Sequence, residues 1–157
     1  MFDAVPRPLL FLDIDGPLIP FGVNPIAAQP DAVLGPLLAA LPCELVWATT
    51  WTHEANRSVS PALGLQPLAV VDWPDRSDAA IDAWFGLHWK TRTLVEWAAG
   101  RAFIWADDEL RDSDREWVSE HHEGPALLYG VDPGIGLLRD DIAIFADWLA
   151  GQGKWAG

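Results

Sequence analysis

The chain has 157 residues, of which half are hydrophobic and 21% are charged, a composition typical of one folded domain and not of a disordered acidic protein. Its 23 acidic and 10 basic side chains give a net charge of −13, which disfavours binding to nucleic-acid backbones or to anionic membranes. The single cysteine, Cys43, excludes an internal disulfide, and no apolar run is long enough for a membrane span or a signal peptide, so we expect a cytoplasmic protein.

Short apolar runs alternate along the chain with segments of helical spacing. The runs predict five strands, at residues 9–12, 44–48, 68–71, 102–106 and 126–129. The other segments predict helices, at residues 31–41, 78–85, 91–99, 114–122 and 138–149. Strands that are apolar throughout are typical of parallel sheets covered by helices on both faces. We therefore expect an α/β fold: a three-layer α/β/α Rossmann-like domain with a five-stranded, mainly parallel sheet.

This domain should take up the whole chain, residues 1–157, because no linker or internal repeat divides the sequence. Its core should extend over about residues 8–150, and the tail at 151–157 should fray. A loop rich in Pro and Gly, residues 17–30, follows the first strand. The chain is therefore expected to form one folded unit.

Polar side chains directly follow three of the predicted strands. They are Asp13 and Asp15, Thr49 and Thr50, and Asp107 and Asp108. In open parallel sheets, ligands bind at the carboxyl ends of the strands, so these side chains should share a site. Lys90, which precedes the helix leading into the fourth strand, could add a positive charge there.

Carboxylates gathered at one site repel one another, and their pKa values rise unless a cation binds between them. Ligand sets made only of oxygen atoms favour a hard cation, and Mg²⁺ in particular when the substrate carries phosphate. These positions offer no His and no pair of Cys, which disfavours zinc. Carboxylates with Mg²⁺, a Thr hydroxyl and a Lys ammonium suit a phosphoryl group.

Four motifs appear in order between Leu9 and Asp112: FLDIDGPL, LVWATT, Lys90 and FIWADDELRD. As an ordered set they resemble the motifs of the haloacid dehalogenase-like (HAD) hydrolase superfamily. Four shorter segments are also similar to the small, uncapped HAD domains grouped with the "Swiss Army Knife" RNA-repair proteins: WATTW, LHWKT, WADDE and VDPGIGL. The resemblance implies a Rossmann-like fold and a Mg²⁺-dependent phosphatase.

Position by position, the resemblance assigns roles to four catalytic residues. Asp13 would attack phosphorus and form an aspartyl-phosphate, and Asp15 would protonate the leaving oxygen and then activate water. Thr49 and Lys90 would hold the phosphoryl oxygens. Thr49 is preferred to Thr50 because it ends the apolar strand, but the choice between them stays open.

The resemblance also implies a metal site and contacts to substrate. The metal ligands would be the Asp13 side chain, the backbone carbonyl of Asp15, and Asp108 with Asp107 close by; which of the last two binds directly stays open. Asp112 would support the site from outside. Candidate substrate contacts are Gly16, Thr50 and Trp51, and His53 and His88 could also reach the substrate.

The intervals between the motifs leave no room for a separate cap domain, so the site should be open, with residues 17–22 as a short flap. We expect a phosphorylated small molecule or a terminal phosphomonoester as substrate. A nucleic-acid end fits the resemblance, but the net charge of −13 disfavours it. No membrane partner is expected, and the oligomeric state is left open.

Each motif also has an ordinary structural explanation. Acidic residues and Thr after strands often cap helices, and Lys90 could be a solvated lysine at a helix start. Three functions therefore remain open: a hydrolase, a phosphotransferase with another acceptor, and a non-catalytic HAD-like interaction or regulatory domain. No motif position is visibly degraded, which favours the hydrolase.

Overall fold

The computed structural model describes residues 6–21, 29–74 and 79–152. Five strands lie within these ranges: β1 (Leu9–Leu12), β2 (Glu44–Trp47), β3 (Ala69–Val70), β4 (Phe103–Asp107) and β5 (Ala126–Gly130). They pair in the order β3-β2-β1-β4-β5, and all pairs are parallel. This confirms the predicted α/β fold with a five-stranded parallel sheet.

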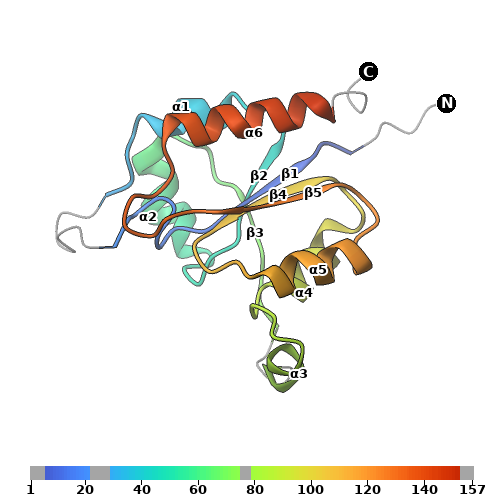
Figure 1. Cartoon of the computed structure of the whole chain (residues 1–157). Helices are drawn as coiled ribbons and strands as arrows, with labels where there is room; N and C mark the ends of the chain where they lie inside the picture. The colour runs from blue at the N-terminus through green and yellow to red at the C-terminus, as the bar shows by residue number, and fades with distance from the viewer. Residues whose placement is uncertain (1–5, 22–28, 75–78, 153–157) are drawn as a thin grey trace.

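Helices cover both faces of the sheet and give the domain its three layers (Figure 1). The helices are α1 (Leu34–Ala39), α2 (Glu54–Leu63), α3 (Ala79–Trp84), α4 (Thr91–Ala98), α5 (Asp112–His121) and α6 (Arg139–Gly151). In the view of Figure 1, α1 and α6 lie above the sheet and α4 and α5 below it. None of the helices in the described ranges is long and apolar enough to cross a membrane.

Strand β1 divides the hydrophobic core into two halves because its side chains alternate between the two faces. Leu10 and Leu12 pack with the α1, α2 and α6 side, whereas Leu9 and Phe11 pack with the α4 and α5 side. All four side chains are completely buried, and each such burial stabilises the fold by about 1.5–3 kcal/mol. The chain that leaves β1 is therefore held firmly in the middle of the molecule.

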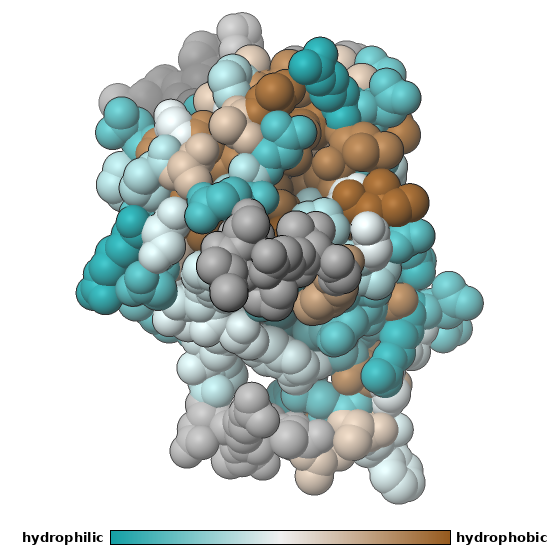
Figure 2. All heavy atoms as spheres, turned by 90° about the vertical axis from the view of Figure 1, so that its left-hand side faces the viewer, coloured by the Kyte–Doolittle hydropathy of each residue, from teal (hydrophilic) through white to brown (hydrophobic). Residues whose placement is uncertain are grey.

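The strand order indicates at which edge of the sheet a binding crevice is expected. From β1 the chain moves outward to β2 and β3 on one side, and later returns to β4 and β5 on the other. The crevice of such a sheet lies at the carboxyl end of the strands where the direction reverses, which is the end of β1. Figure 2 looks onto this edge of the molecule and shows hydrophobic side chains over its upper part.

The predicted elements agree with the structure except at several boundaries and at one helix. Helix α2 was not predicted, because only one narrow side of it is apolar and Pro61 lies inside it. Residues 31–33 form a turn before α1 begins at Leu34, and the Asp31 carboxylate accepts a hydrogen bond from the Val33 N–H within it. The tail beyond residue 152 and residue 22 of the predicted flap lie outside the described residues.

Candidate active site

The ends of β1 and β4 bring two acidic side chains together. Leu12 lies opposite Ala106 in the sheet, so the residues that follow, Asp13 and Asp107, are neighbours. Both are buried, at 8% and 1% exposure. Two carboxylates buried this deeply need a positive charge beside them, because burial strongly disfavours an isolated charge.

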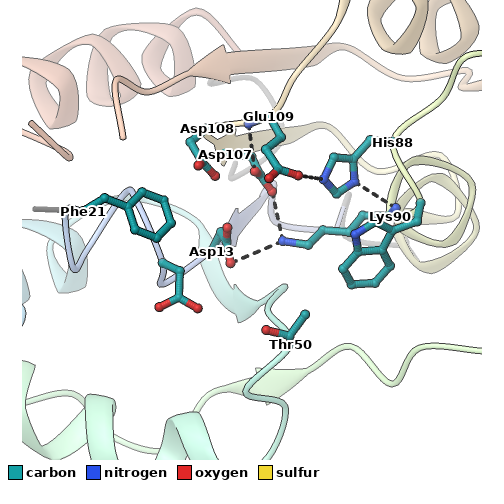
Figure 3. Close-up of a pocket in the computed structure, with 10 residues that line it drawn as sticks. Asp13, Phe21, Thr50, His88, Lys90, Asp107, Asp108 and Glu109 are labelled. Atoms are coloured by element: carbon teal, nitrogen blue, oxygen red, sulfur yellow. Dashed lines mark hydrogen bonds and ion pairs between the residues drawn. The ribbon is translucent and has the colours of Figure 1, made fainter. Parts of the chain in front are cut away.

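Lys90 supplies that compensation. Its Nζ lies 2.9 Å from Oδ2 of Asp107 and 3.3 Å from Oδ1 of Asp13 (Figure 3). It also donates a hydrogen bond to the backbone oxygen of Ala48, at 2.8 Å. The Lys90 side chain is 4% exposed, so the ammonium is fixed between β1, β2 and β4 and is not a solvated lysine.

Asp108 joins the two buried acids to form a cluster that could hold a metal ion. One carboxylate oxygen from each of Asp13, Asp107 and Asp108 lies within 4.8 Å of the others. Both oxygens of Asp107 already accept hydrogen bonds, Oδ2 from Lys90 and Trp105 and Oδ1 from the Glu109 N–H. Asp108 is only partly buried and faces the pocket. This geometry favours Asp108 over Asp107 as a direct ligand.

The pKa values of the cluster show that its three carboxyl groups are not equivalent. Burial raises the pKa of Asp13 to about 7, although Lys90 acts against this shift. Burial, reinforced by the neighbouring Asp107, raises the pKa of Asp108 to about 6. Burial also opposes the ionisation of Asp107, but Lys90 outweighs it and lowers the pKa of that group. One ammonium therefore balances one carboxylate, and a further cation would be needed to ionise the other two fully.

We expect the metal-free protein to lose stability between about pH 4 and about pH 8, relative to an Asp13→Asn variant. The pKa of Asp13 rises from 3.8 to about 7 on folding. The stability that this shift contributes is therefore fully present below the pKa of the unfolded state and is lost as the pH rises through the pKa of the folded state. Burial lowers the pKa of His88 and has the opposite effect on stability, but it does so in both proteins. Urea unfolding in EDTA measures the free energy of unfolding of both proteins. Between about pH 4 and about pH 8, the difference between them should shift by roughly 2–4 kcal/mol in favour of the variant. A difference that does not change with pH would contradict the raised pKa.

The two threonines after β2 have different environments. Thr49 is completely buried, and its Oγ1 accepts a hydrogen bond from the Trp51 N–H at 3.2 Å. Thr50 is exposed and lines the pocket, where its side chain faces the Asp13–Lys90 pair (Figure 3). Of the two hydroxyls, only that of Thr50 lines the pocket, so the geometry favours Thr50 over Thr49 as the predicted phosphate contact. Apolar strand patterns end at Thr49, but they do not say which of two adjacent hydroxyls points outward.

Two other predicted residues, Trp51 and Gly16, lie beside acidic side chains of the site. Trp51 Nε1 donates a hydrogen bond to Oδ2 of Asp15 at 3.1 Å, so the indole orients a carboxylate and does not line the pocket. Gly16 has φ of +102°, and a Cβ there would come within 2.9 Å of Cγ of Asp108. This glycine lets the Asp108 side chain approach the chain after β1. The Asp15 side chain lies outside the three-carboxylate cluster, and ligation by its backbone carbonyl stays a prediction.

A buried residue of α5, Asp114, holds the residues on either side of Lys90 by hydrogen bonds. Its Oδ1 accepts hydrogen bonds from the His88 N–H at 2.8 Å and the Thr91 hydroxyl at 2.7 Å, and its Oδ2 accepts one from the Arg111 N–H. Asp114 is completely buried. It clamps the segment that carries Lys90 onto α5, and sequence reasoning missed it.

Asp112, for which a supporting role was expected, does not contact the site. Its side chain is fully exposed and pairs with Arg115 at 3.5 Å. Asp112 and Asp114 are two positions apart on one helix, so they point in nearly opposite directions. The supporting acid is therefore the second of the two.

His88 is part of the pocket wall and was only a minor candidate. Its Nδ1 accepts a hydrogen bond from the Lys90 N–H at 3.1 Å, which leaves Nε2 to donate to Glu109, also at 3.1 Å. Burial lowers the pKa of His88, in keeping with a neutral ring. His53, the other candidate histidine, pairs with Asp72 on the surface.

Together these residues form a pocket of about 250 Å³. Its lining residues are Asp13, Asp15, Phe21, Thr50, His88, Trp89, Lys90, Asp107, Asp108 and Glu109. Comparisons with known proteins found no matching family model, no similar curated protein and no similar solved structure.

Proposed function

We propose that the chain is a Mg²⁺-dependent phosphatase of the HAD type, which hydrolyses a phosphomonoester through an aspartyl-phosphate on Asp13. The observation that carries the proposal is the juxtaposition of Asp13, Asp107 and Asp108 with the buried Lys90 ammonium at the end of the central strand. Positive and negative groups so arranged are suited to a phosphoryl group, which brings its own negative charge.

The donor set fits Mg²⁺. The cluster offers only carboxylate oxygens, and the raised pKa values of Asp13 and Asp108 indicate that positive charge is lacking there. Asp13 and Asp108 would hold the ion, with Asp107 beside them. When bound, Mg²⁺ would neutralise phosphoryl oxygens and keep both carboxylates ionised.

Asp13 would act as the nucleophile. Its Oδ1 accepts a hydrogen bond from the Ile14 N–H at 2.9 Å and faces Lys90, which leaves Oδ2 for attack on phosphorus. The bond from Oδ2 to phosphorus would form as the ester P–O bond breaks, with the electron pair leaving on the ester oxygen. Lys90 and Thr50 would hold the remaining phosphoryl oxygens.

Asp15 would transfer the proton. With Oδ2 held by Trp51, its Oδ1 is the atom that would donate a proton to the leaving oxygen and later take one from water. Attack of that water on the aspartyl-phosphate would release inorganic phosphate and restore the Asp13 carboxylate. Both half-reactions use the same two carboxyl groups.

Hydrolysis of phenyl phosphate should require Mg²⁺ and stop in EDTA, and excess Mg²⁺ should restore it. Beryllium fluoride with Mg²⁺, which mimics an aspartyl-phosphate, should raise the melting temperature of the wild-type protein but not that of Asp13→Asn. Beryllium fluoride binding without turnover would mean an intact site with a narrow choice of substrate. Absence of both binding and turnover would overturn the proposal and favour a non-catalytic interaction domain.

A further inference from the structure

Two exposed aromatic rings form opposite walls of the pocket. Phe21 and Trp89 both line it, although 57% and 40% of their surfaces are exposed. Figure 3 places Phe21 on one side of Asp13, with His88 and Lys90 on the other side. Large aromatic side chains bury 150–250 Å² when they are fully packed, so leaving two of them open at a polar site calls for a reason.

The Phe21 wall is anchored by the loop that carries the VDPGIGL segment. The Phe21 N–H donates a hydrogen bond to the Pro133 oxygen at 2.8 Å, and the Leu137 N–H donates one to the Pro17 oxygen at 2.7 Å. Gly136 has φ of +79°, and a Cβ there would come within 2.8 Å of Cγ of Pro20. The 131–137 segment therefore packs directly against the chain that presents Phe21.

The Trp89 wall is held by two other aromatic rings. Trp73 meets it edge-on with centroids 4.8 Å apart, and His88 stacks on it at 5.5 Å. Trp73 is itself fixed, because its Nε1 donates a hydrogen bond to the Thr49 oxygen at 2.9 Å. Walls that are already in place lose little conformational entropy when a ligand arrives, which favours binding.

Size and charge limit what can lie between these walls. The pocket of about 250 Å³ is below the range of about 300–1,000 Å³ typical of sites for drug-sized ligands, so one phosphoryl group and one small ring would fill it. Asp15, Asp108 and Glu109 line the same space, and a second anionic group on the substrate would meet their charges.

Resting on the proposed function, we infer that the substrate is the phosphomonoester of a small alcohol that carries an uncharged aromatic ring, with the phosphoryl group at Asp13 and Lys90 and the ring between Phe21 and Trp89. Aromatic pairs contribute beyond their buried area, so the ring itself is recognised and not merely its bulk. Polyphosphorylated and polyanionic compounds are excluded by the negative charges of the acidic residues that line the pocket, Asp15, Asp108 and Glu109.

Equilibrium binding of two phosphonates tests this inference without turnover. Benzylphosphonate and cyclohexylmethylphosphonate carry the same charge and nearly the same bulk, and calorimetry with saturating Mg²⁺ should show the benzyl compound binding about 5-fold more tightly to the wild-type protein. Trp89→Ala and Phe21→Ala should each reduce this ratio toward one. Trp84→Ala should leave it unchanged, because Trp84 is 85% exposed on α3 and lies outside the pocket.

The possible results separate the two proposals. Equal affinity for both phosphonates, or tighter binding of 2-aminoethylphosphonate, would overturn the aromatic substrate while phenyl phosphate hydrolysis and beryllium fluoride binding still supported the phosphatase. Loss of phosphonate and beryllium fluoride binding together would overturn both. A benzyl preference that survives Trp89→Ala and Phe21→Ala would place the ring elsewhere and also overturn the inference.

Discussion

Asp13→Asn is expected to lower kcat for phosphomonoester hydrolysis by at least about 1,000-fold, because an amide cannot replace the carboxylate as a nucleophile. The fold should survive. Asn has the same shape, its Oδ1 can still accept the hydrogen bond from the Ile14 N–H, and the change removes a charge from a side chain that is only 11% exposed. In EDTA at about pH 8, where the wild-type carboxylate is ionised, the variant should melt at a higher temperature than the wild-type protein.

Steady-state rates with phenyl phosphate and thermal unfolding of the same samples measure the two effects together. Asp147→Asn is the matched control: it removes an exposed carboxylate from α6, outside the pocket, and should change neither the rate nor the melting temperature appreciably. A variant that keeps a tenth of the wild-type kcat would exclude Asp13 as the nucleophile. A loss of activity together with a lower melting temperature would instead indicate damage to the fold.

The fold could be predicted because its central elements carry strong local signals. Strand β1 is apolar at every position, and all four of its side chains are completely buried. Helix α2 shows where such signals are insufficient. It has few apolar positions, and it packs against the core through Ala55, Val59 and Leu63. Its stability depends on tertiary contacts with α1 and the sheet, which a pattern within the helix does not reveal.

The candidate site, too, could be predicted from the sequence only in part. Asp13, Lys90, Asp107 and Asp108 were expected to meet, because the carboxyl ends of parallel strands share one edge and the motifs follow in order. The choice between Thr49 and Thr50 stayed open, and the buried Asp114 was missed. Which side chain of a pair points into a site depends on turn geometry, and the hydrogen bond from the His88 N–H to Asp114 joins residues 26 positions apart. Such long-range partners have no counterpart in local sequence.

Lys90→Met is expected to destabilise the metal-free protein by about 3–5 kcal/mol at about pH 8, because removing one partner of a buried ion pair leaves the other charges uncompensated. Asp107 and Asp13 would then face each other without the ammonium that lies 2.9 and 3.3 Å from them. Without Lys90 the pKa of Asp107 should rise, so at about pH 5 more of this carboxyl group would be protonated and uncharged. The destabilisation should therefore be smaller at about pH 5 than at about pH 8.

Added Mg²⁺ should recover part of the lost stability, because a cation among the carboxylates would replace the missing positive charge. Urea unfolding at both pH values, with Mg²⁺ or EDTA, measures all three effects. Arg57→Met provides the comparison: Arg57 pairs with Glu54 on the surface of α2, and its loss should change the free energy of unfolding by less than about 1 kcal/mol at either pH. If Lys90→Met behaved like Arg57→Met, the Lys90 ammonium could not be the group that balances the buried carboxylates, and the electrostatic basis of the proposed phosphoryl site would fail with it.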